Sequence, residues 1–433
     1  MEMLRQNSFE HSFDRSVWEV FSPTAGGTSR TVHQRLMGQQ SCLSLPIASS
    51  PVATNQQRPA DCFYQAWLRQ TEEPVNDLEV SSLSIVDLFS GCGGMSVGLG
   101  EAASAMGINA KHLFAAEHDQ TIAKVYQRNL KPENLHVGDI SKVFDGVFGE
   151  TATDTEGEFV SRIGEVGLLC GGPPCQGHSD LNNYTRRNDP RNSLYFLMAR
   201  AAELLRPRAV IIENVPGVKR DRTGNFGRTI FALEELGYSV EVTTLNAKDY
   251  GVPQSRKRTF VFAAENQAVT ARWKKNLVDL ADPIVRTPLW SIGDLLDVEP
   301  TTPFDQASNL SAESRARVDW LFENSKYELD DSMRPDCHRL KSHSYNSVYG
   351  RMRENTPAPT MTTGFLVMGQ GRFIHPTRRR TITPHEGARI QTFPDYFDFG
   401  NQKRGMFARM IGNAVPPLLA YYVGLASMEA IIH

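Results

Sequence analysis

The feature that most restricts the fold is a regular alternation, from Ser84 onward, between short apolar runs and longer amphipathic stretches. Apolar runs of this length indicate buried strands, and the amphipathic stretches indicate helices. Strands that alternate with helices predict an α/β fold with a doubly wound, mostly parallel sheet, whose ligands gather at the carboxyl ends of the strands. The pairs are 85–89 with 95–106, 113–117 with 120–129, 166–170 with 194–205, and 209–213 with 226–236.

The region before this alternation has a different composition. The chain has 433 residues, 40% hydrophobic and 22% charged, enough for a sizeable core and for two or more domains. Residues 1–78 are rich in Ser, Gln, Thr and Pro and show no sustained period. This pattern predicts a partly disordered N-terminal extension.

The remaining boundaries follow from where the alternation stops and returns. We expect the main domain to span residues 79–264. Residues 265–380 carry Pro-rich pieces and polar turns, which predict a second, smaller domain. Within 381–433, Thr383 with Glu386 three residues later predicts a capping-box start of a helix. We expect this last part to return to the main domain.

Charge and cysteine content set limits on compartment and partners. The net charge of −3 argues against a basic surface throughout, although an enzyme of nucleic acids can confine positive charge to one cleft. The six cysteines lack the paired spacing of a metal site, so we expect no metal and a reducing cytoplasm. The first residues lack a basic segment followed by an apolar run, so we expect no secretory signal. The apolar tail 418–432 is too short to span a membrane and carries Glu429, which predicts a packed helix.

A glycine-rich turn at residues 87–94 follows the first strand and opens a helix. Small residues there let the backbone approach a ligand closely. A dinucleotide fingerprint read from Gly91 would need a glycine at position 96, where Ser96 stands. The carboxylate of Asp87 would repel phosphates but tolerate a cationic ligand. The turn therefore favours S-adenosyl-L-methionine over NAD.

Two acidic residues follow the next strands. Glu117 ends the run 113–117, where a carboxylate can accept hydrogen bonds from both ribose hydroxyls. Asp139 follows another short run and could accept from an adenine amino group. A solvated charge for Glu117 and a helix N-cap for Asp139 are the alternatives.

A cysteine stands at the tip of a rigid turn. Residues 168–180 form a short apolar run that ends in Gly-Gly-Pro-Pro and presents Cys175, which we interpret as a nucleophile. A thiol with a pKa of about 8.5 needs activation by backbone donors or by cations such as Arg256 or Arg258. Cys170, inside the strand, is expected to pack as a small apolar residue.

Polar residues gather beside this cysteine in the predicted sheet. Glu213 ends the run 209–213, so its carboxyl group emerges at the same edge as Cys175. Gln254, Arg256 and Arg258 alternate before the apolar strand that follows them, which predicts that they share one face. One guanidinium there can bind a carbonyl oxygen and another can hold Glu213 or a phosphate. Helix capping by Glu213 and a solvated charged face are the alternatives.

These motifs, in this order, resemble the DNA (cytosine-5)-methyltransferase family. The resemblance covers residues from about 84 to 433 and implies a class I S-adenosylmethionine-dependent methyltransferase fold with a target-recognition domain at 265–380. His178 stands where the family commonly has Phe, which we expect to change loop packing only. The six blocks are 87–94, 174–176, 213–215, the Gln254/Arg256/Arg258 set, 389–395 and 412–417.

The resemblance implies a covalent mechanism and a cofactor site. Carbon 5 of cytosine is a poor nucleophile, and a thiolate that adds to carbon 6 makes carbon 5 able to attack a methyl group. Glu213 would stabilise the charge on ring nitrogen 3. The implied catalytic set is Cys175, Glu213, Arg256 and Arg258. The cofactor set is Asp87, Phe89, Gly91, Gly93, Glu117, Asp139, Pro173, Asn413 and Val415.

The resemblance also implies a duplex substrate whose target base is flipped out, at a cost of about a few kcal/mol. A loop at about 177–193 would close over the DNA, and residues 265–380 would read the major groove. The extension 1–78 either packs outside the main domain or helps to bind DNA or a partner. The candidate DNA contacts are Gln176, Ser179, Arg186, Arg187, Arg191, Gln254, Arg351, Arg353 and Thr362.

The interpretation that these observations favour is a bacterial-type DNA cytosine-5 methyltransferase that acts on double-stranded DNA as a monomer in the cytoplasm, associated with the nucleoid. We expect the modification half of a restriction system, with an independent endonuclease, or a solitary enzyme. Cytosine-5 methylation of tRNA and a non-catalytic DNA-binding regulator are the alternatives. An NAD-linked oxidoreductase rests on the glycine turn alone.

Overall fold

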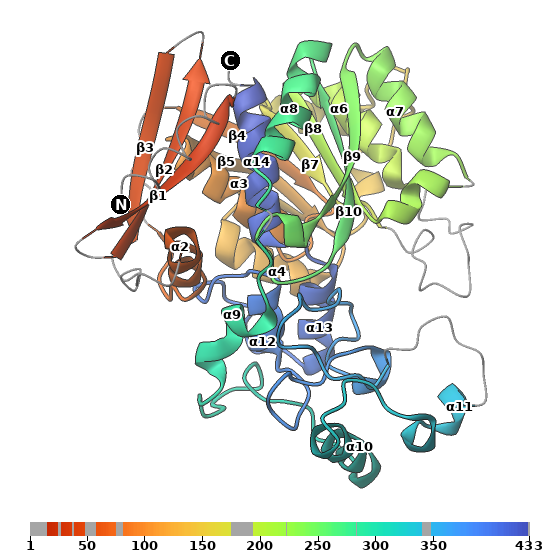
Figure 1. The fold of residues 1–433 in the computed structure, drawn as a ribbon. Helices are drawn as coiled ribbons and strands as arrows, with labels where there is room; N and C mark the ends of the chain where they lie inside the picture. The colour runs from red at the N-terminus through yellow and green to blue at the C-terminus, as the bar shows by residue number, and fades with distance from the viewer. Residues whose placement is uncertain are drawn as a thin grey trace.

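A computed structural model describes residues 15–24, 27–36, 39–47, 58–74, 81–174, 194–221, 223–282, 284–339 and 348–431. Within them, a seven-stranded sheet in the order β6-β5-β4-β7-β8-β10-β9 forms the centre of the molecule (Figure 1). The strands are β4 Ser82–Leu88, β5 Asn109–Glu117, β6 Asn134–Val137, β7 Leu168–Gly171, β8 Ala209–Asn214, β9 Ser239–Asn246 and β10 Lys257–Ala264.

The direction of the strands follows the prediction. β4 pairs in parallel with β5 and β7, β5 with β6, and β7 with β8. Only β10 reverses, since it runs antiparallel to both β8 and β9. The predicted doubly wound, mostly parallel sheet is confirmed, and the carboxyl ends of β4, β5, β7 and β8 meet at one edge.

Helices cover both faces of the sheet (Figure 1). Successive residues of a strand face opposite sides, so Ile211 packs with α3, α8 and α14, whereas Ile212 packs with α5, α6 and α7. The pairing of buried strands with amphipathic helices produces two apolar layers. These helices are α3 Gly94–Ala105, α4 Gln120–Leu130, α5 Asp154–Ile163, α6 Leu197–Leu205, α7 Asn225–Glu235, α8 Gln267–Asp279 and α14 Pro417–Ile431, with short 3-10 turns η2 Ile140–Lys142, η4 Pro216–Arg220 and η5 Ala247–Asp249.

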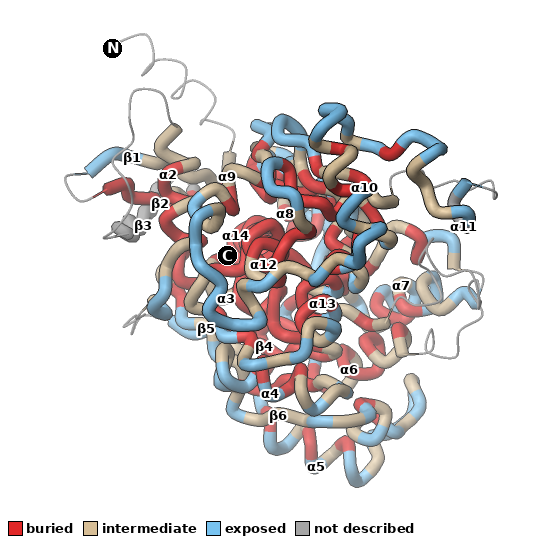
Figure 2. Tube along the Cα trace, turned by 90° about the horizontal axis from the view of Figure 1, so that it is seen from below, coloured by how far each residue is buried: buried red, intermediate tan, exposed pale blue. Residues whose placement is uncertain are grey.

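The C-terminal helix lies in the core. Residues 417–430 are all buried, and Figure 2 shows α14 and α12 at the centre of the molecule with exposed segments around the rim. The stretch Arg404–Ile431 is long and apolar enough to cross a membrane, but 94% of its most apolar window is buried inside the protein. Glu429 accepts a hydrogen bond from Asn276 Nδ2 at 2.7 Å. The predicted packed helix is confirmed.

The described part of the N-terminal extension has regular structure that the sequence pattern did not predict. It forms an antiparallel sheet of β1 Val17–Thr24, β2 Gly27–Leu36 and β3 Gln39–Ile47, followed by α2 Pro59–Leu68. Arg30 is buried, donates to Glu101 Oε1 of α3 at 2.7 Å, and lies between the rings of Phe63 and Tyr421. The contact that holds this sheet against α3 and α14 is thus made by a buried arginine. Because a charged residue does not count in an apolar pattern, the periodicity of apolar residues did not predict the sheet.

The second region is built from short elements and loops. Its own small core contains Val318, Leu321 and Ile374, while Phe365 packs against Val97 of α3. The predicted boundary at 265 lies too early, because Trp273 of α8 stacks on Phe262 of the sheet. The elements are α9 Pro288–Ile292, η6 Gly293–Leu295, α10 Ala312–Glu323, η7 Asp331–Met333, α11 Asp336–Arg339 and η8 Met368–Gln370.

The last part of the chain returns to the main domain through α12 Pro384–Ile390 and α13 Arg404–Asn413. The predicted capping box at the start of α12 is confirmed. Thr383 Oγ1 accepts from the amide of Glu386, and the Glu386 carboxylate accepts from the amide of Thr383.

Candidate active site

The glycine turn, residues 89–94, joins β4 to α3 in a conformation that favours glycine. Phe89, Gly91 and Gly93 have φ values of +59°, +55° and +100°. A Cβ on Gly94 would lie 2.5 Å from the carbonyl oxygen of Val415, so α3 packs directly on the C-terminal segment. A Cβ on Gly91 would meet no atom within 4 Å, which leaves open space beside the turn.

Glu117 lies against this turn, as predicted from the strand order. Its Oε2 accepts from the amide of Gly91 at 3.1 Å, and its Oε1 accepts from the amide of Asp119 at 2.9 Å. The side chain is partly exposed. Two backbone donors therefore fix the carboxylate at the edge of the open space, which is not the geometry of a freely solvated charge.

Asp87 lies elsewhere than its predicted direct cofactor contact requires. It is fully buried behind the turn, where its Oδ2 accepts from Ser96 Oγ at 2.6 Å, and Ser96 Oγ lies 3.0 Å from Tyr126 Oη. Burial raises the pKa of Asp87 to about 7. The side chain faces α3 and α4 because β4 alternates its faces, so Asp87 supports the turn from within.

Asp139 is exposed in the loop after β6. Its Oδ1 accepts from the amide of Ser141 at 3.0 Å, which caps η2 and lowers the pKa of the Asp139 carboxyl group. The capping alternative is thus what the contacts show. The loop still lies beside Glu117, since the amide of Gly138 donates to the Glu117 carbonyl oxygen at 3.0 Å.

The predicted carboxyl group of Glu213 forms an ion pair with Arg258. Arg258 Nε lies 2.8 Å from Glu213 Oε1, and the two side chains are only 13% and 11% exposed. Burial raises the pKa of Glu213, although the charges of Arg258 and Arg256 oppose this shift. A carboxyl group in this setting can carry a proton and donate a hydrogen bond.

The turn that leads to Cys175 is held beside this pair. Asn214 Nδ2 donates to the carbonyl oxygen of Pro173 at 3.1 Å, and a Cβ on Gly172 would lie 3.3 Å from Glu213 Oε2. Asn214 therefore fixes the backbone two residues before Cys175. The predicted site residues Cys175, Gln176, Ser179, Arg186, Arg187 and Arg191 lie outside the described residues.

Gln254 and Arg256 do not share the surroundings of Arg258. Gln254 is fully buried, with Nε2 donating to Gln391 Oε1 and Oε1 accepting from the amide of Met361, both at 2.8 Å. Its predicted role as a DNA contact does not fit this burial. Arg256, 1% exposed, donates to the carbonyl oxygens of Met361, Gly412 and Ala414 at 2.8, 3.0 and 2.9 Å. These contacts make it a positioning residue rather than a catalytic one.

Residues 83–428 match the family of C-5 cytosine-specific DNA methylases. The chain belongs to this family. It is 43% identical over 369 residues to the type II methyltransferase M1.BsuMI of Bacillus subtilis. The aligned residues cover 85% of this chain and 86% of that protein. It is 30% identical over 381 residues to the type II methyltransferase M.DdeI of Desulfomicrobium norvegicum, covering 78% and 86%.

Solved structures show the same fold. A DNA modification methyltransferase encoded within an Escherichia coli prophage aligns with a TM-score of 0.54 and 23% identity, covering 81% of this chain and 99% of that one. The S. pombe Dnmt2 methyltransferase aligns with a TM-score of 0.54 and 19% identity, covering 80% and 98%. The predicted methyltransferase fold is confirmed, and so is the predicted activity, DNA cytosine-5 methylation.

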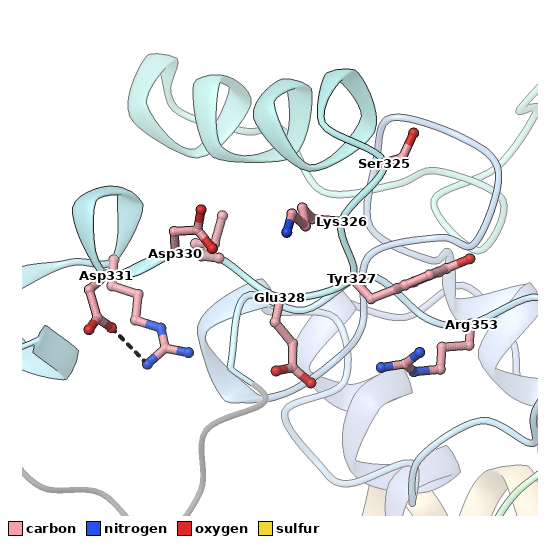
Figure 3. Close-up of a pocket in the computed structure, with 9 residues that line it drawn as sticks. Ser325, Lys326, Tyr327, Glu328, Asp330, Asp331 and Arg353 are labelled. Atoms are coloured by element: carbon pink, nitrogen blue, oxygen red, sulfur yellow. Dashed lines mark hydrogen bonds and ion pairs between the residues drawn. The ribbon is translucent and has the colours of Figure 1, made fainter.

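Two arginine side chains of the methylase's second region differ in their exposure and in how many contacts hold them. Arg351 is locked, since its Nε donates to the Pro376 carbonyl oxygen at 2.7 Å and its guanidinium lies 4.1 Å from the centre of the Phe322 ring. Arg353 is exposed and stacks on Tyr327 at 4.8 Å. Both residues line a hollow of about 500 Å³, together with Lys326, Glu328 and Asp330. Figure 3 shows these side chains around the hollow.

The C-terminal segment of the methylase packs on the glycine turn. Val415 packs on Gly94, whereas Asn413, at the end of α13, is exposed. Thr362 of the second region is partly exposed, and its Oγ1 accepts from the amide of Gly364 at 3.3 Å. Three predicted regions, at 89–94, 117 and 413–415, are thus brought to one place.

Sequence reasoning missed the roles of three buried polar residues, Ser96, Tyr126 and Gln391. Gln391 stands in the block 389–395, but no function follows from its position there. For Ser96, the sequence showed only that it stands where a dinucleotide fingerprint would need a glycine. Among the described residues, no group of three or more His, Cys, Asp or Glu side chains is arranged to hold a metal ion.

Proposed function

We propose that the methylase transfers the methyl group of S-adenosyl-L-methionine to carbon 5 of a flipped cytosine in duplex DNA, with Cys175 as the nucleophile. The observation that carries the proposal is the buried Glu213–Arg258 pair beside Pro173. Pro173 is two residues before Cys175 in the chain, and Glu213 provides a carboxyl group that can hold a proton.

The chemistry divides between these residues. The Cys175 thiolate forms a bond to carbon 6, and the displaced electron pair makes carbon 5 the nucleophile. Glu213 donates a hydrogen bond to ring nitrogen 3, which stabilises the charge that builds as sulfur adds. Arg258 orients Glu213 through its Nε. Carbon 5 would then bond to the methyl group, and the sulfonium that carried it would leave as a neutral thioether. Loss of the carbon 5 proton to solvent then expels the thiolate and leaves 5-methylcytosine.

The residues present fit the cofactor. The open space beside Gly91 gives room for a ligand, and Glu117 presents a fixed carboxylate to it. We assign ribose binding to Glu117 and adenine binding to Asp139, with Phe89, Gly93, Pro173, Asn413 and Val415 lining the pocket. S-Adenosyl-L-methionine supplies an electrophilic methyl group on a sulfonium. Asp87 acts by supporting the turn.

The DNA contacts divide into phosphate and base contacts. We assign phosphate contacts to Arg186, Arg187 and Arg191, whose cations suit them, and DNA contacts to Gln176 and Ser179. In the second region, Arg353 is suited to a base edge because it is exposed and already ordered on Tyr327, and Thr362 is partly exposed. Arg351 holds this surface in place rather than contacting a base.

The biological setting follows from the relatives, two of which are type II methyltransferases. We assign this methylase to the modification half of a restriction system, with a separately acting endonuclease, or to a solitary enzyme of the same kind. We further propose that the methylase is cytoplasmic and associated with the nucleoid. A monomer is sufficient, because one cytosine per strand is modified at a time.

The experiment is transfer of a tritiated methyl group to unmethylated plasmid DNA and to bulk tRNA in parallel, followed by bisulfite sequencing. We expect label in DNA at cytosines of one short motif. Cys175→Ser should reduce transfer by at least about 1,000-fold, because no thiolate remains to attack carbon 6. Cofactor binding, measured by calorimetry, should stay close to wild type. Label only in tRNA, or substantial activity in Cys175→Ser, would contradict the proposal.

A further inference from the structure

Three buried polar side chains form a network between the second region and the C-terminal segment. Gln254, Arg256 and Gln391 are 0%, 1% and 0% exposed. Gln254 and Arg256 lie just before β10, and Gln391 is the C-cap residue of α12. The hydrogen bond from Gln254 Nε2 to Gln391 Oε1, at 2.8 Å, joins the two amides.

One end of this network holds Met361, next to Thr362 of the second region. Gln254 Oε1 accepts from the amide of Met361, and Arg256 Nη1 donates to its carbonyl oxygen, both at 2.8 Å. Both backbone groups of Met361 are therefore satisfied by the network. Thr360 next to it donates to the Ser255 carbonyl oxygen at 2.8 Å.

The other end holds the segment 411–414, which leads to Val415. Gln391 Nε2 donates to the carbonyl oxygens of Ile411 and Ala414, at 2.5 and 3.3 Å. Arg256 Nη2 donates to those of Gly412 and Ala414. These are carbonyl groups at the end of α13, which have no partner within the helix and need one from outside.

The two held segments also touch each other. A Cβ on Gly412 would lie 2.4 Å from the carbonyl carbon of Thr362, so the backbones meet without a side chain between them. Val415 in turn packs on Gly94 of the glycine turn. A shift of Met361 therefore has to move the segment 411–415 and, with it, one wall of the proposed cofactor pocket.

We propose that Gln254, Arg256 and Gln391 couple DNA binding to cofactor binding, as positioning residues that hold both segments in one geometry. This coupling rests on the proposed function of Thr362, Asn413 and Val415. Breaking one link leaves a buried donor or acceptor without a partner, so both segments loosen together rather than separately. Each ligand, by linkage, then favours the arrangement that the other needs.

Gln254 provides the sharpest test, because within the described part of the chain its side-chain hydrogen bonds reach Met361 and Gln391 rather than the segment 411–415. Gln254→Met keeps the length of the side chain and removes both hydrogen bonds. We expect the affinity for S-adenosyl-L-methionine, measured by calorimetry without DNA, to fall by about 5- to 50-fold. The affinity for a duplex containing the target motif, measured by fluorescence anisotropy, should fall by a similar factor.

Gln391→Met tests the reverse direction, because the side-chain hydrogen bonds of Gln391 among the described residues reach Gln254 and the segment 411–414, and Gln254 in turn bonds to Met361. It should weaken duplex binding as well as cofactor binding. The double variant should cost little more than the larger single change, since both remove the same link. Gln254→Asn, which keeps an amide of shorter reach, is a milder variant that preserves the test should Gln254→Met fold poorly.

Ser427→Ala is the matched control. It removes an equally buried hydrogen bond, which Trp273 Nε1 donates to Ser427 Oγ at 3.0 Å between α8 and α14. It should lower the melting temperature and leave both affinities within twofold. Unchanged cofactor affinity in Gln254→Met, with wild type binding both ligands, would overturn the coupling alone. Wild type that bound neither ligand would overturn the proposed function and the coupling with it.

Discussion

The glycine turn and the second region hold their side chains in different ways. In the turn, backbone groups do most of the work, since the amides of Gly91 and Asp119 fix Glu117 and the backbone of Val415 packs on Gly94. In the second region, side chains hold side chains, as where Arg353 stacks on Tyr327 and Arg372 pairs with Glu328. Where backbone groups form a site, few substitutions are tolerated, because the backbone conformation itself must be kept. Where side chains form the site, single substitutions can change what it binds.

The largest effect should come from a change of Glu213, at the carboxyl end of β8. Glu213→Gln keeps the shape of the side chain but cannot supply an acidic proton to ring nitrogen 3. We expect kcat to fall by about 100- to 10,000-fold with cofactor affinity unchanged. Single-turnover methyl transfer with saturating DNA measures this. A variant with near wild-type kcat would remove Glu213 from the chemistry.

The glycine turn should be intolerant of a single methyl group. Gly94→Ala places a Cβ 2.5 Å from the Val415 carbonyl oxygen, so we expect a loss of about 2–4 kcal/mol in stability or a shift of this wall of the proposed cofactor pocket. Gly100→Ala, in the same helix, meets no atom within 4 Å and should stabilise by about 0.5–1 kcal/mol. Urea unfolding compares the two. Equal effects would mean that contact with Val415 is unimportant.

Asp87 should make the stability of the turn depend on pH. Its pKa in the folded protein, about 7, lies above the ordinary aspartate value of 3.8, so the folded state binds more protons than the unfolded state between these values. Stability therefore falls as pH rises through this window, by an amount on the order of 2–4 kcal/mol.

Asp87→Asn does not titrate and keeps an acceptor for Ser96. The difference in unfolding free energy between the variant and wild type should grow in favour of the variant from pH 5 to pH 8. Urea titrations at four pH values check the trend, and a difference independent of pH would contradict it.

The smallest effect, and the most selective, should come from the second region. Arg353→Ala removes an exposed guanidinium without disturbing a core, so we expect a loss of about 1–3 kcal/mol in duplex binding and relaxed preference at one base pair. Cofactor affinity and melting temperature should stay unchanged. Arg351→Ala, by contrast, should lower the melting temperature, because Arg351 holds Pro376 and packs on Phe322. Bisulfite profiles of both variants separate base recognition from folding.

The comparison also explains which structural predictions succeeded. The sheet and the capping box of α12 were predictable because they depend on local periodicity and spacing. The N-terminal sheet was missed because Arg30 is its buried anchor, and that contact joins residues 71 positions apart. The boundary at 265 was misplaced because α8 packs on the sheet through Trp273, which no local pattern reveals.

The candidate site shows the same division at the level of single residues. Arg256 and Arg258 alternate in the sequence and have the same chemistry, yet one is enclosed by carbonyl oxygens of two distant segments and the other pairs with Glu213. Glu117 was placed correctly because the end of β5 must adjoin the end of β4 in a parallel sheet. Asp87 was misjudged because the face of the strand on which it lies depends on the packing of α3.

The order of the motifs alone determined the fold class, the family and the edge of the sheet where we propose that the chemistry takes place, because strand order and chain direction confine those motifs to one edge. Only the tertiary structure decided which polar residues face that edge and which, like Gln254 and Arg256, are buried to hold segments together. The reason is physical: the role of a hydrogen-bonding side chain depends on the partners that packing brings to it, and those partners lie more than 100 residues away.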